Sequence, residues 1–229
     1  MSFATHREGI EAGRLDMFVD GAFAFTLTLL AIGGETIPDT PPKLLHLLGA
    51  LPASAACFVQ IASFWHGHVK WRHACVASTR TGLLLSLALV FLALVFVYPL
   101  HMVYASLFHA ISGGALSPEF EISSGAELGL LFAVYGLAYT CMAGTLALLF
   151  RHAARLETDP GHALEARVAA LTWTIGASVG LLSAIIAMVI PDNAPPIWWA
   201  VPGCIYSLLF IMGTATRRYR QRHAVAAIP

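Results

Sequence analysis

The chain has 229 residues, of which 58% are hydrophobic and 11% are charged. Soluble domains usually have about a quarter of their residues charged, so the composition excludes an ordinary soluble domain and is typical of a membrane protein. The 13 Lys and Arg residues balance the 13 Asp and Glu residues, and we expect no nucleic-acid partner.

Six stretches are long enough to cross the hydrocarbon core of a bilayer, which takes about 20 residues of helix. They are residues 17–33, 44–69, 81–104, 128–150, 168–190 and 197–216. The second is long and contains Pro52, so part of it is expected to tilt or to lie in the membrane interface. No signal-peptide cleavage pattern follows the polar N-terminal residues, so the first stretch is expected to stay in the mature protein. The pattern predicts a single all-α domain over 1–229, a polytopic membrane protein with six transmembrane helices.

Basic residues alternate between the connecting segments. The segments before the first stretch, between the second and third, between the fourth and fifth, and after the sixth hold 12 of the 13 Lys and Arg residues, and the other loops hold only Lys43. Because cytoplasmic loops are enriched in Lys and Arg, both termini are predicted to be cytoplasmic. Trp198 and Trp199 begin the sixth stretch at the position of an interfacial aromatic belt.

The first stretch is the one that carries charge into the bilayer. Asp20 lies about one turn inside it, where an ionised carboxylate costs up to ~2.5 to 3.5 kcal/mol at full depth and less near the interface. Arg14 is about 120° away around the helix axis, so it cannot pair with Asp20 within the helix. The partner of Asp20 is expected from another helix, and His68 is considered for a structural pairing with Asp20. The candidates at the same membrane level, at the end of the second stretch, are Trp65, His66, His68, Trp71 and His73.

Two stripes follow from the period of the first helix, at about 100° per residue. One contains Phe25, Thr28, Leu29 and Ile32, and it continues back through Phe18 to Arg14. The other contains Asp20, Ala24, Leu27 and Ala31. Small residues allow close helix packing, so the second stripe is predicted to bury Asp20 against its own bundle. The first stripe either faces lipid or the chain's own core, or lines a conduit formed by several subunits.

The later stretches have no Asp, Glu, Lys or Arg in their interiors. This argues against proton-coupled transport and intramembrane catalysis, so we expect no enzyme. Four cysteines without a C-x-x-C pair indicate neither a disulfide framework nor a thiolate metal site. His66, His68 and His73 are open to three interpretations: a metal site, structural pairing, or solvated interface residues. No carboxylate or thiolate lies at ligand spacing, so no metal site is predicted.

Two local patterns concern the later stretches. Asp159, Pro160 and Gly161 predict a turn between the fourth and fifth. Gly176 and Gly180 form a G-x-x-x-G pattern, for which packing between helices of one subunit is the favoured use.

The first stretch carries a recognisable motif. Arg14-x-x-x-Phe18-Val19-Asp20-Gly21 resembles the R-x-x-x-F-S-D signature that opens the first helix of the potassium-channel family typified by transmembrane protein 175. Trp65-x-x-His68 is similar to the W-x-x-H element of that family. The resemblance implies a potassium-permeable channel without a T-V-G-Y-G filter. For a single six-helix chain it implies a prokaryotic homotetramer in the cell membrane, with its pore around the four first helices, potassium as the permeant ion and no cofactor.

The resemblance also implies residue roles. The pore-lining layers would be Phe25, Thr28, Leu29 and Ile32, with an apolar constriction that controls wetting and a Thr layer that supplies oxygens to the ion. The residues that would hold the pore helix in register are Arg14, Phe18, Asp20, Gly21, Trp65 and His68.

Three departures from the family pattern are present, and two alternatives stay open. Val19 replaces the signature Ser, the third stretch lacks the Asn that is common there, and Phe25 is bulkier than the usual Ile or Leu. The alternatives are a small-solute or metal transporter, with His66 or His101 facing a cavity, and a non-conducting membrane scaffold of the same fold.

Overall fold

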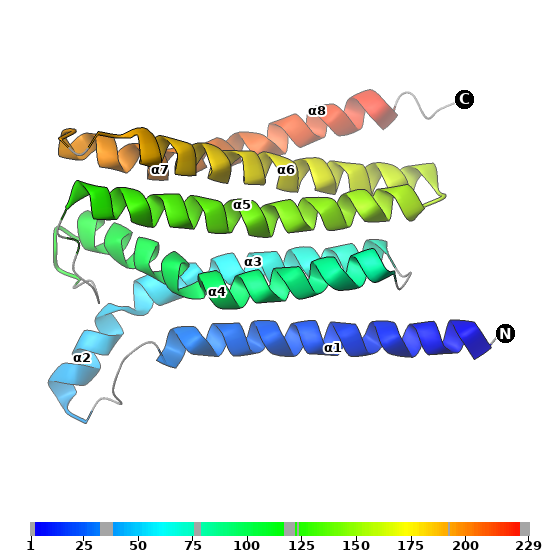
Figure 1. The fold of residues 1–229 in the computed structure, drawn as a ribbon, viewed down its shortest axis with the longest axis horizontal. Coiled ribbons are helices and arrows are strands. Elements are labelled where there is room, and N and C mark those ends of the chain that lie inside the picture. Colours follow the sequence, from blue (N-terminus) through cyan, green and yellow to red (C-terminus); the bar gives the residue numbers. More distant parts are fainter. Residues whose placement is uncertain are drawn as a thin grey trace.

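The computed structural model describes residues 3–32, 39–75, 79–116, 122, 124–191 and 193–224. Its elements are α1 (Phe3–Ile32), α2 (Pro41–Gly49), α3 (Leu51–Ala74), α4 (Arg80–Ile111), α5 (Gly125–Leu156), α6 (Pro160–Val189), η1 (Pro196–Ala200), α7 (Val201–Cys204), η2 (Ile205–Ile211) and α8 (Met212–Ala224). These described residues contain helices and no strands, which confirms the all-α prediction. The long helices run alternately up and down in an elongated bundle (Figure 1).

Each predicted stretch coincides with helical structure. Four of the described helical segments are long and apolar enough to cross a membrane, or five if the bent pair α2 and α3 forms one span. The four are α4, α5, α6 and the segment from Ile197 to Arg222. The helix α1 is not among them, so six membrane crossings stay a prediction.

The four basic segments lie at one end of the bundle. The start of α1, the end of α3, the start of α4, the turn between α5 and α6 and the end of α8 are together there in Figure 1. The alternating charge pattern therefore corresponds to two ends of one bundle, a basic end and an opposite end. That the basic end is cytoplasmic stays a prediction.

The second stretch is broken into two helices. The helix α2 ends at Gly49, α3 begins at Leu51, and the two are bent by 43°. Pro52 lies in the first turn of α3, where its missing N–H is not needed for a helix hydrogen bond. The break lies two residues before Pro52, and the expected tilt or interfacial position of part of this stretch stays a prediction.

The predicted turn between the fourth and fifth stretches is also observed. Asp159 caps α6, because its carboxylate accepts a hydrogen bond of 2.8 Å from the backbone N–H of His162, and Pro160 is the first residue of the helix. This hydrogen bond favours the charged form and lowers the pKa of the Asp159 carboxyl group. A capping carboxylate at this position also fits the positive end of the helix dipole.

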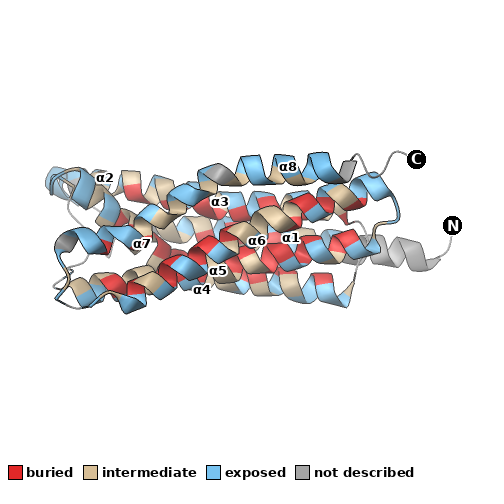
Figure 2. Cartoon of the chain, turned by 90° about the horizontal axis from the view of Figure 1, so that it is seen from above, coloured by how far each residue is buried: buried red, intermediate tan, exposed pale blue. Residues whose placement is uncertain are grey.

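The helices α5 and α6 are in backbone contact at two glycines. A Cβ atom on Gly136 would lie 2.6 Å from the carbonyl oxygen of Gly180, and one on Gly180 would lie 2.9 Å from that of Gly136. The hydroxyl of Thr140 bridges the pair by donating to the carbonyls of Gly136 and Ala177 at 2.7 and 3.2 Å. Gly180 therefore serves packing within the subunit, as expected. Buried residues follow this pair in Figure 2, whereas α2 and α8 are largely exposed.

Candidate functional site

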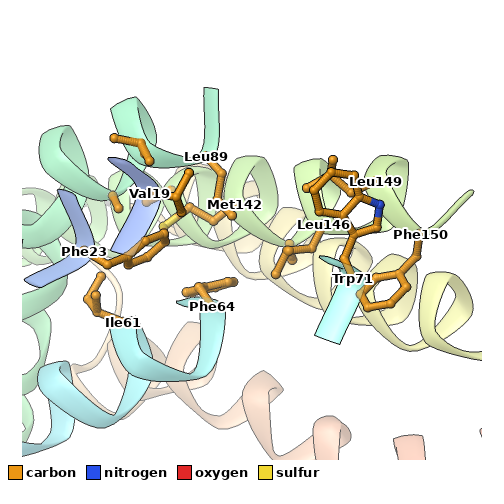
Figure 3. Close-up of a cluster of buried hydrophobic side chains, with 14 of the residues drawn as sticks. Val19, Phe23, Ile61, Phe64, Trp71, Leu89, Met142, Leu146, Leu149 and Phe150 are labelled. Carbon is orange, nitrogen blue, oxygen red and sulfur yellow. The ribbon is translucent and has the colours of Figure 1, made fainter. Parts of the chain in front are cut away.

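One face of α1 packs into the bundle. Val19, Phe23 and Thr26 are fully or almost fully buried on this face. Val19 and Phe23 lie beside Ile61 and Phe64 of α3 (Figure 3). The Thr26 hydroxyl donates to the backbone carbonyl of Ala22 at 2.8 Å, which satisfies a polar group that would otherwise be buried without a partner.

The prediction that Asp20 and its stripe are buried is wrong. Asp20 and Ala24 are exposed and Leu27 is half-buried. The buried face lies between the two predicted stripes. Branched and aromatic side chains make many more dispersion contacts than alanine, so Val19 and Phe23 rather than Ala24 pack in the core cluster with residues of α3 and α4. Val19, where the family signature has Ser, belongs to the hydrophobic core.

An ion pair joins α1 to the basic end of α3. The Arg72 guanidinium donates from Nε to Asp16 at 2.7 Å and from Nη1 to the carbonyl oxygen of Cys75 at 2.7 Å. The side chains of Arg72 and Asp16 are 15% and 37% exposed. This pair is therefore better shielded from solvent than a surface ion pair, and it fixes the position of α1 along α3.

A second polar contact lies further along α1. The indole N–H of Trp65 donates to the Asp20 carboxylate at 2.8 Å, which confirms that the partner of Asp20 comes from another helix. The predicted pairing of His68 with Asp20 is wrong. His68 is buried and its Nε2 is 2.9 Å from the Ser86 hydroxyl of α4. The third stretch thus contributes Ser86 to the network.

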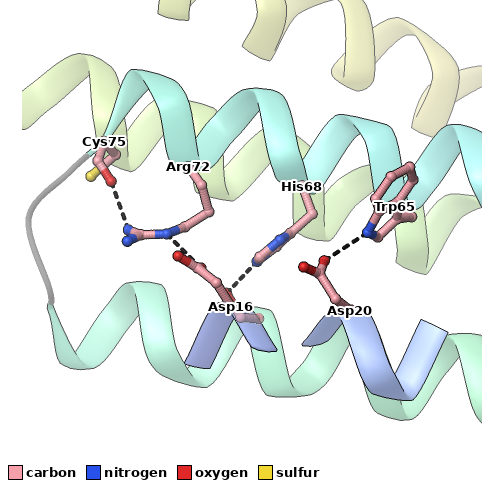
Figure 4. Close-up of polar contacts among 7 residues, drawn as sticks. Asp16, Asp20, Trp65, His68, Arg72 and Cys75 are labelled. Atoms are coloured by element: carbon pink, nitrogen blue, oxygen red, sulfur yellow. Dashed lines mark hydrogen bonds and ion pairs between the residues drawn. The ribbon is translucent and has the colours of Figure 1, made fainter. Parts of the chain in front are cut away.

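The register of these contacts follows from helix geometry. Asp16 and Asp20 are one turn apart on α1, and the residues at positions 65, 68 and 72 lie within about 60° of one another on α3. Because α1 and α3 are antiparallel, the earlier carboxylate meets the later α3 residue (Figure 4). A W-x-x-H-x-x-x-R spacing could therefore have indicated Arg72, and the i,i+4 spacing to Asp20 could have indicated Asp16, but neither residue was predicted.

The proposed pore-lining residues are on a different part of α1. The Phe25 side chain is 58% exposed, Thr28 is also exposed, and Leu29 is half-buried against the core. The Thr28 hydroxyl donates to the carbonyl of Phe25 at 2.7 Å. Ile32 ends α1, and its side chain lies outside the described residues. The exposed part of this stripe has no cover in the single chain.

Three of the predicted supporting residues do not join the network. Arg14 is exposed and forms no hydrogen bond or ion pair with any residue that the structure describes. Phe18 is exposed as well, and a Cβ atom on Gly21 would meet nothing within 4 Å. Asp20, Trp65 and His68 make contacts within the chain, whereas Arg14, Phe18 and Gly21 lie on its uncovered surface.

A buried polar group links the middle of three helices. The Gln60 carbonyl oxygen of α3 accepts hydrogen bonds from the hydroxyls of Tyr104 in α4 and Tyr135 in α5, the second at 3.0 Å. A buried amide with two hydrogen bonds holds neighbouring helices in one register. Gln60 is uncharged, so the charge pattern of the sequence did not indicate this group.

The transporter alternative receives little support from the histidines. His66 is exposed, and Nε2 of His101 is 3.1 Å from the Ser54 hydroxyl. A pocket of about 260 Å³ lies near the basic end, between Lys70 and His73 of α3 and Glu165 of α6. Within the described ranges, no group of three or more His, Cys, Asp or Glu residues is placed to hold a metal ion.

We expect the ion pair between Asp16 and Arg72 to stabilise the chain measurably. In a double-mutant cycle with Asp16→Asn and Arg72→Gln, the coupling free energy should be about 1 to 2 kcal/mol, because the pair is partly shielded and well aligned. The hydrogen bond from Arg72 to Cys75 is lost in the Arg72→Gln single variant and in the double variant. Its contribution therefore cancels in the cycle. Equilibrium unfolding in mixed micelles measures the coupling.

The matched control is an exposed pair of the same type. Arg220 and Glu165 are 2.6 Å apart, but their side chains are 52% and 55% exposed. Their coupling should stay below about 0.5 kcal/mol, as is usual for exposed pairs. Equal coupling at both pairs would show that the contact with Arg72 does not hold α1 in place.

This chain is similar to known proteins in sequence and in fold. Residues 14–99 match the family described as the endosomal/lysosomal potassium channel TMEM175. A protein of Marivirga tractuosa named a potassium channel is 27% identical over 193 residues, which cover 80% of this chain and 77% of that protein. This chain is also similar to the crystal structure of the potassium channel MtTMEM175, which is a threonine-to-alanine variant in complex with a nanobody–MBP fusion protein. The TM-score is 0.76 at 24% sequence identity, and the match covers 91% of this chain and 93% of that chain. The structural likeness establishes the shared fold.

Proposed function

We propose that this chain is a member of the TMEM175 family and the subunit of a potassium-permeable cation channel. The family match at residues 14–99 includes the uncovered surface of α1 and the contacts that hold α1 to α3 and α4. Its relatives are named potassium channels. The family consists of ion channels, and the chain is not an enzyme.

One observation carries the proposal: α1 is anchored on one face and uncovered on another. Ion pairing and hydrogen bonding hold Asp16 and Asp20, and Val19 and Phe23 fill the core. Phe25 nevertheless remains 58% exposed. A helix fixed in this way presents a defined surface to neighbouring copies of the same chain.

Four copies of α1 around an axis would enclose the pore. One helix cannot surround an ion path, and the subunits of closed homo-oligomers are related by symmetry. The open space beside Gly21 gives a neighbouring helix room to approach, as small residues do at helix interfaces in membranes. Arg14 and Phe18 are exposed on the same helix and are available for contacts between subunits.

Phe25 would form the constriction in such a tetramer. A ring of apolar side chains opposes wetting, so it restricts hydrated ions without a carbonyl filter. Thr28 lies about one turn further along. Because its hydroxyl hydrogen is donated to the Phe25 carbonyl, the Thr28 oxygen keeps lone pairs that can face a partly dehydrated cation. Leu29 and Ile32 would complete the apolar lining.

The proposed setting is the cell membrane of a prokaryote, with both termini in the cytoplasm. The composition and the candidate spans support a membrane location, and the relative from Marivirga tractuosa is bacterial. Lipid and potassium ions would be the partners of the homotetramer, without a bound cofactor.

Ion flux from reconstituted liposomes tests the proposal. Under matched gradients, potassium flux should exceed sodium flux, because potassium loses its hydration shell more easily at an apolar constriction. Protein-free liposomes and liposomes with denatured protein are the controls. Flux that saturates at low ion concentration without single-channel currents would favour a transporter, and silence with both ions would favour a non-conducting scaffold.

A further inference from the structure

The helix α2 has an apolar face that the chain leaves uncovered. Leu44, Leu45 and Leu48 are exposed, Leu45 to 68%, and Leu47 is half-buried. On a helical projection these four leucines occupy an arc of about 160°. Lys43 lies about 120° from the centre of that arc and forms an exposed ion pair of 2.8 Å with Asp39. The helix is therefore amphipathic.

The helix α2 is not needed to cross the bilayer. The 24 residues of α3 extend about 36 Å at 1.5 Å per residue, which exceeds the roughly 30 Å of a hydrocarbon core. The bend of 43° at Ala50 turns α2 away from the direction of α3. A surplus helix that bends away by 43° at the end of a span is placed to enter the membrane interface at an oblique angle.

The level of α2 along the bundle agrees with this position. Figure 1 places α2 at the end opposite the basic segments, the same end as α7 and the preceding η1. Ile197 and Trp198 of η1 are exposed at this end, and exposed tryptophans are typical of the boundary between lipid and water. The apolar surface also continues from α2 onto Leu51 and Phe58 of α3, which are exposed too.

We infer that α2 is an interfacial helix that lies obliquely in the boundary between lipid and water at the end of the bundle opposite the basic segments. Its leucine face is buried among the upper acyl chains, and Lys43 and Asp39 face water. Lipid covers the leucine face. Burial of these four leucines in lipid provides the apolar contact that the chain itself does not. The inference requires that the bundle spans a bilayer, but it does not depend on ion conduction.

Spin labels on α2 test the inference in lipid vesicles. Single cysteines replace Leu45, Leu48 and, as the matched control, Lys43, in a Cys141→Ala/Cys204→Ser background. The remaining Cys57 and Cys75 are buried, and the labelled background without a new cysteine measures their residual reaction. Power saturation with oxygen, which partitions into lipid, and with a water-soluble nickel chelate reports the depth of each label.

Labels at Leu45 and Leu48 should have an oxygen-to-nickel accessibility ratio at least about fivefold higher than the label at Lys43, as expected for a helix lying in the interface. Because α2 is bent by 43° from α3, labels at Leu44 and Leu48 should differ in depth by less than the about 6 Å expected for a helix along the membrane normal. High nickel accessibility at Leu45 and Leu48 would overturn the inference. Exclusion of both reagents there would show a neighbouring subunit instead of lipid and would overturn it equally. If the vesicles show no ion flux but the labels lie at the expected depths, the proposed channel function is rejected and the interfacial position of α2 is supported.

Discussion

Replacing Phe25 by alanine is expected to raise cation flux through the reconstituted protein by at least about tenfold, equivalent to a barrier lower by ~1.4 kcal/mol. In the proposed tetramer the change removes four phenyl rings from the narrowest layer of the pore. A wider and less apolar constriction admits water more readily, and an ion that keeps more of its hydration shell meets a smaller barrier. The same widening should reduce the preference for potassium over sodium.

The exposure of Phe25 makes this a specific test. Because its side chain is 58% exposed in the single chain, its removal leaves no cavity in the core, and the variant should fold and assemble normally. Phe91→Ala is the matched control. Phe91 is 65% exposed on α4, a helix outside the proposed pore, so its loss should leave flux unchanged.

Liposome flux with potassium and with sodium, normalised to the amount of assembled protein, measures both effects. Unchanged flux in the Phe25→Ala variant would remove this residue from the constriction. An equal increase in the Phe91→Ala variant would indicate a general loosening of the protein rather than a wider pore.

Replacing Gly136 by alanine is expected to have the largest effect on stability, a loss of about 3 kcal/mol or more. The new Cβ atom would lie 2.6 Å from the carbonyl oxygen of Gly180 and 2.8 Å from the backbone nitrogen of Ala184. Both neighbours are backbone atoms, so no side-chain rotation can relieve the overlap. The helices α5 and α6 would have to separate, and the hydrogen bond from Thr140 to Ala177 would lengthen.

Gly144→Ala provides a control on the same helix. A Cβ atom on Gly144 would meet nothing within 4 Å, and alanine is favoured over glycine in a helix by about 0.5 to 1 kcal/mol. Thermal unfolding in detergent should therefore show a Tm lower by roughly 6 °C or more for Gly136→Ala and an unchanged or slightly higher Tm for Gly144→Ala. Similar values for the two variants would show that α5 and α6 are not in the close contact described.

The contacts of α1 show which of its partners could be predicted from the sequence. The charge of Asp20 within an apolar stretch was enough to predict a partner on another helix, and Trp65 was among the residues predicted to support the pore helix. The choice between Trp65 and His68 depended on side-chain geometry, since both lie on the same face of α3. The contribution of Ser86 required the position of a third helix.

The face of α1 that packs inward was predicted incorrectly for a physical reason. Apolar residues surround this helix, and in a bilayer the lipid is as apolar as the protein core. Hydrophobicity therefore cannot distinguish a face that touches lipid or a pore from a face that touches protein. Packing volume decides instead, and it favours Val19 and Phe23 over Ala24.

The sequence alone determined the composition of a membrane protein, the helical stretches, the alternation of basic segments and the motif that resembles the TMEM175 signature. These properties depend on residues close together in the chain, whose hydropathy and helical period are local. Tertiary structure decided which face of α1 is buried and which partners Asp16 and Asp20 have. These contacts join residues 56 and 45 positions apart, and their geometry depends on how α3 and α4 pack, which no local pattern specifies.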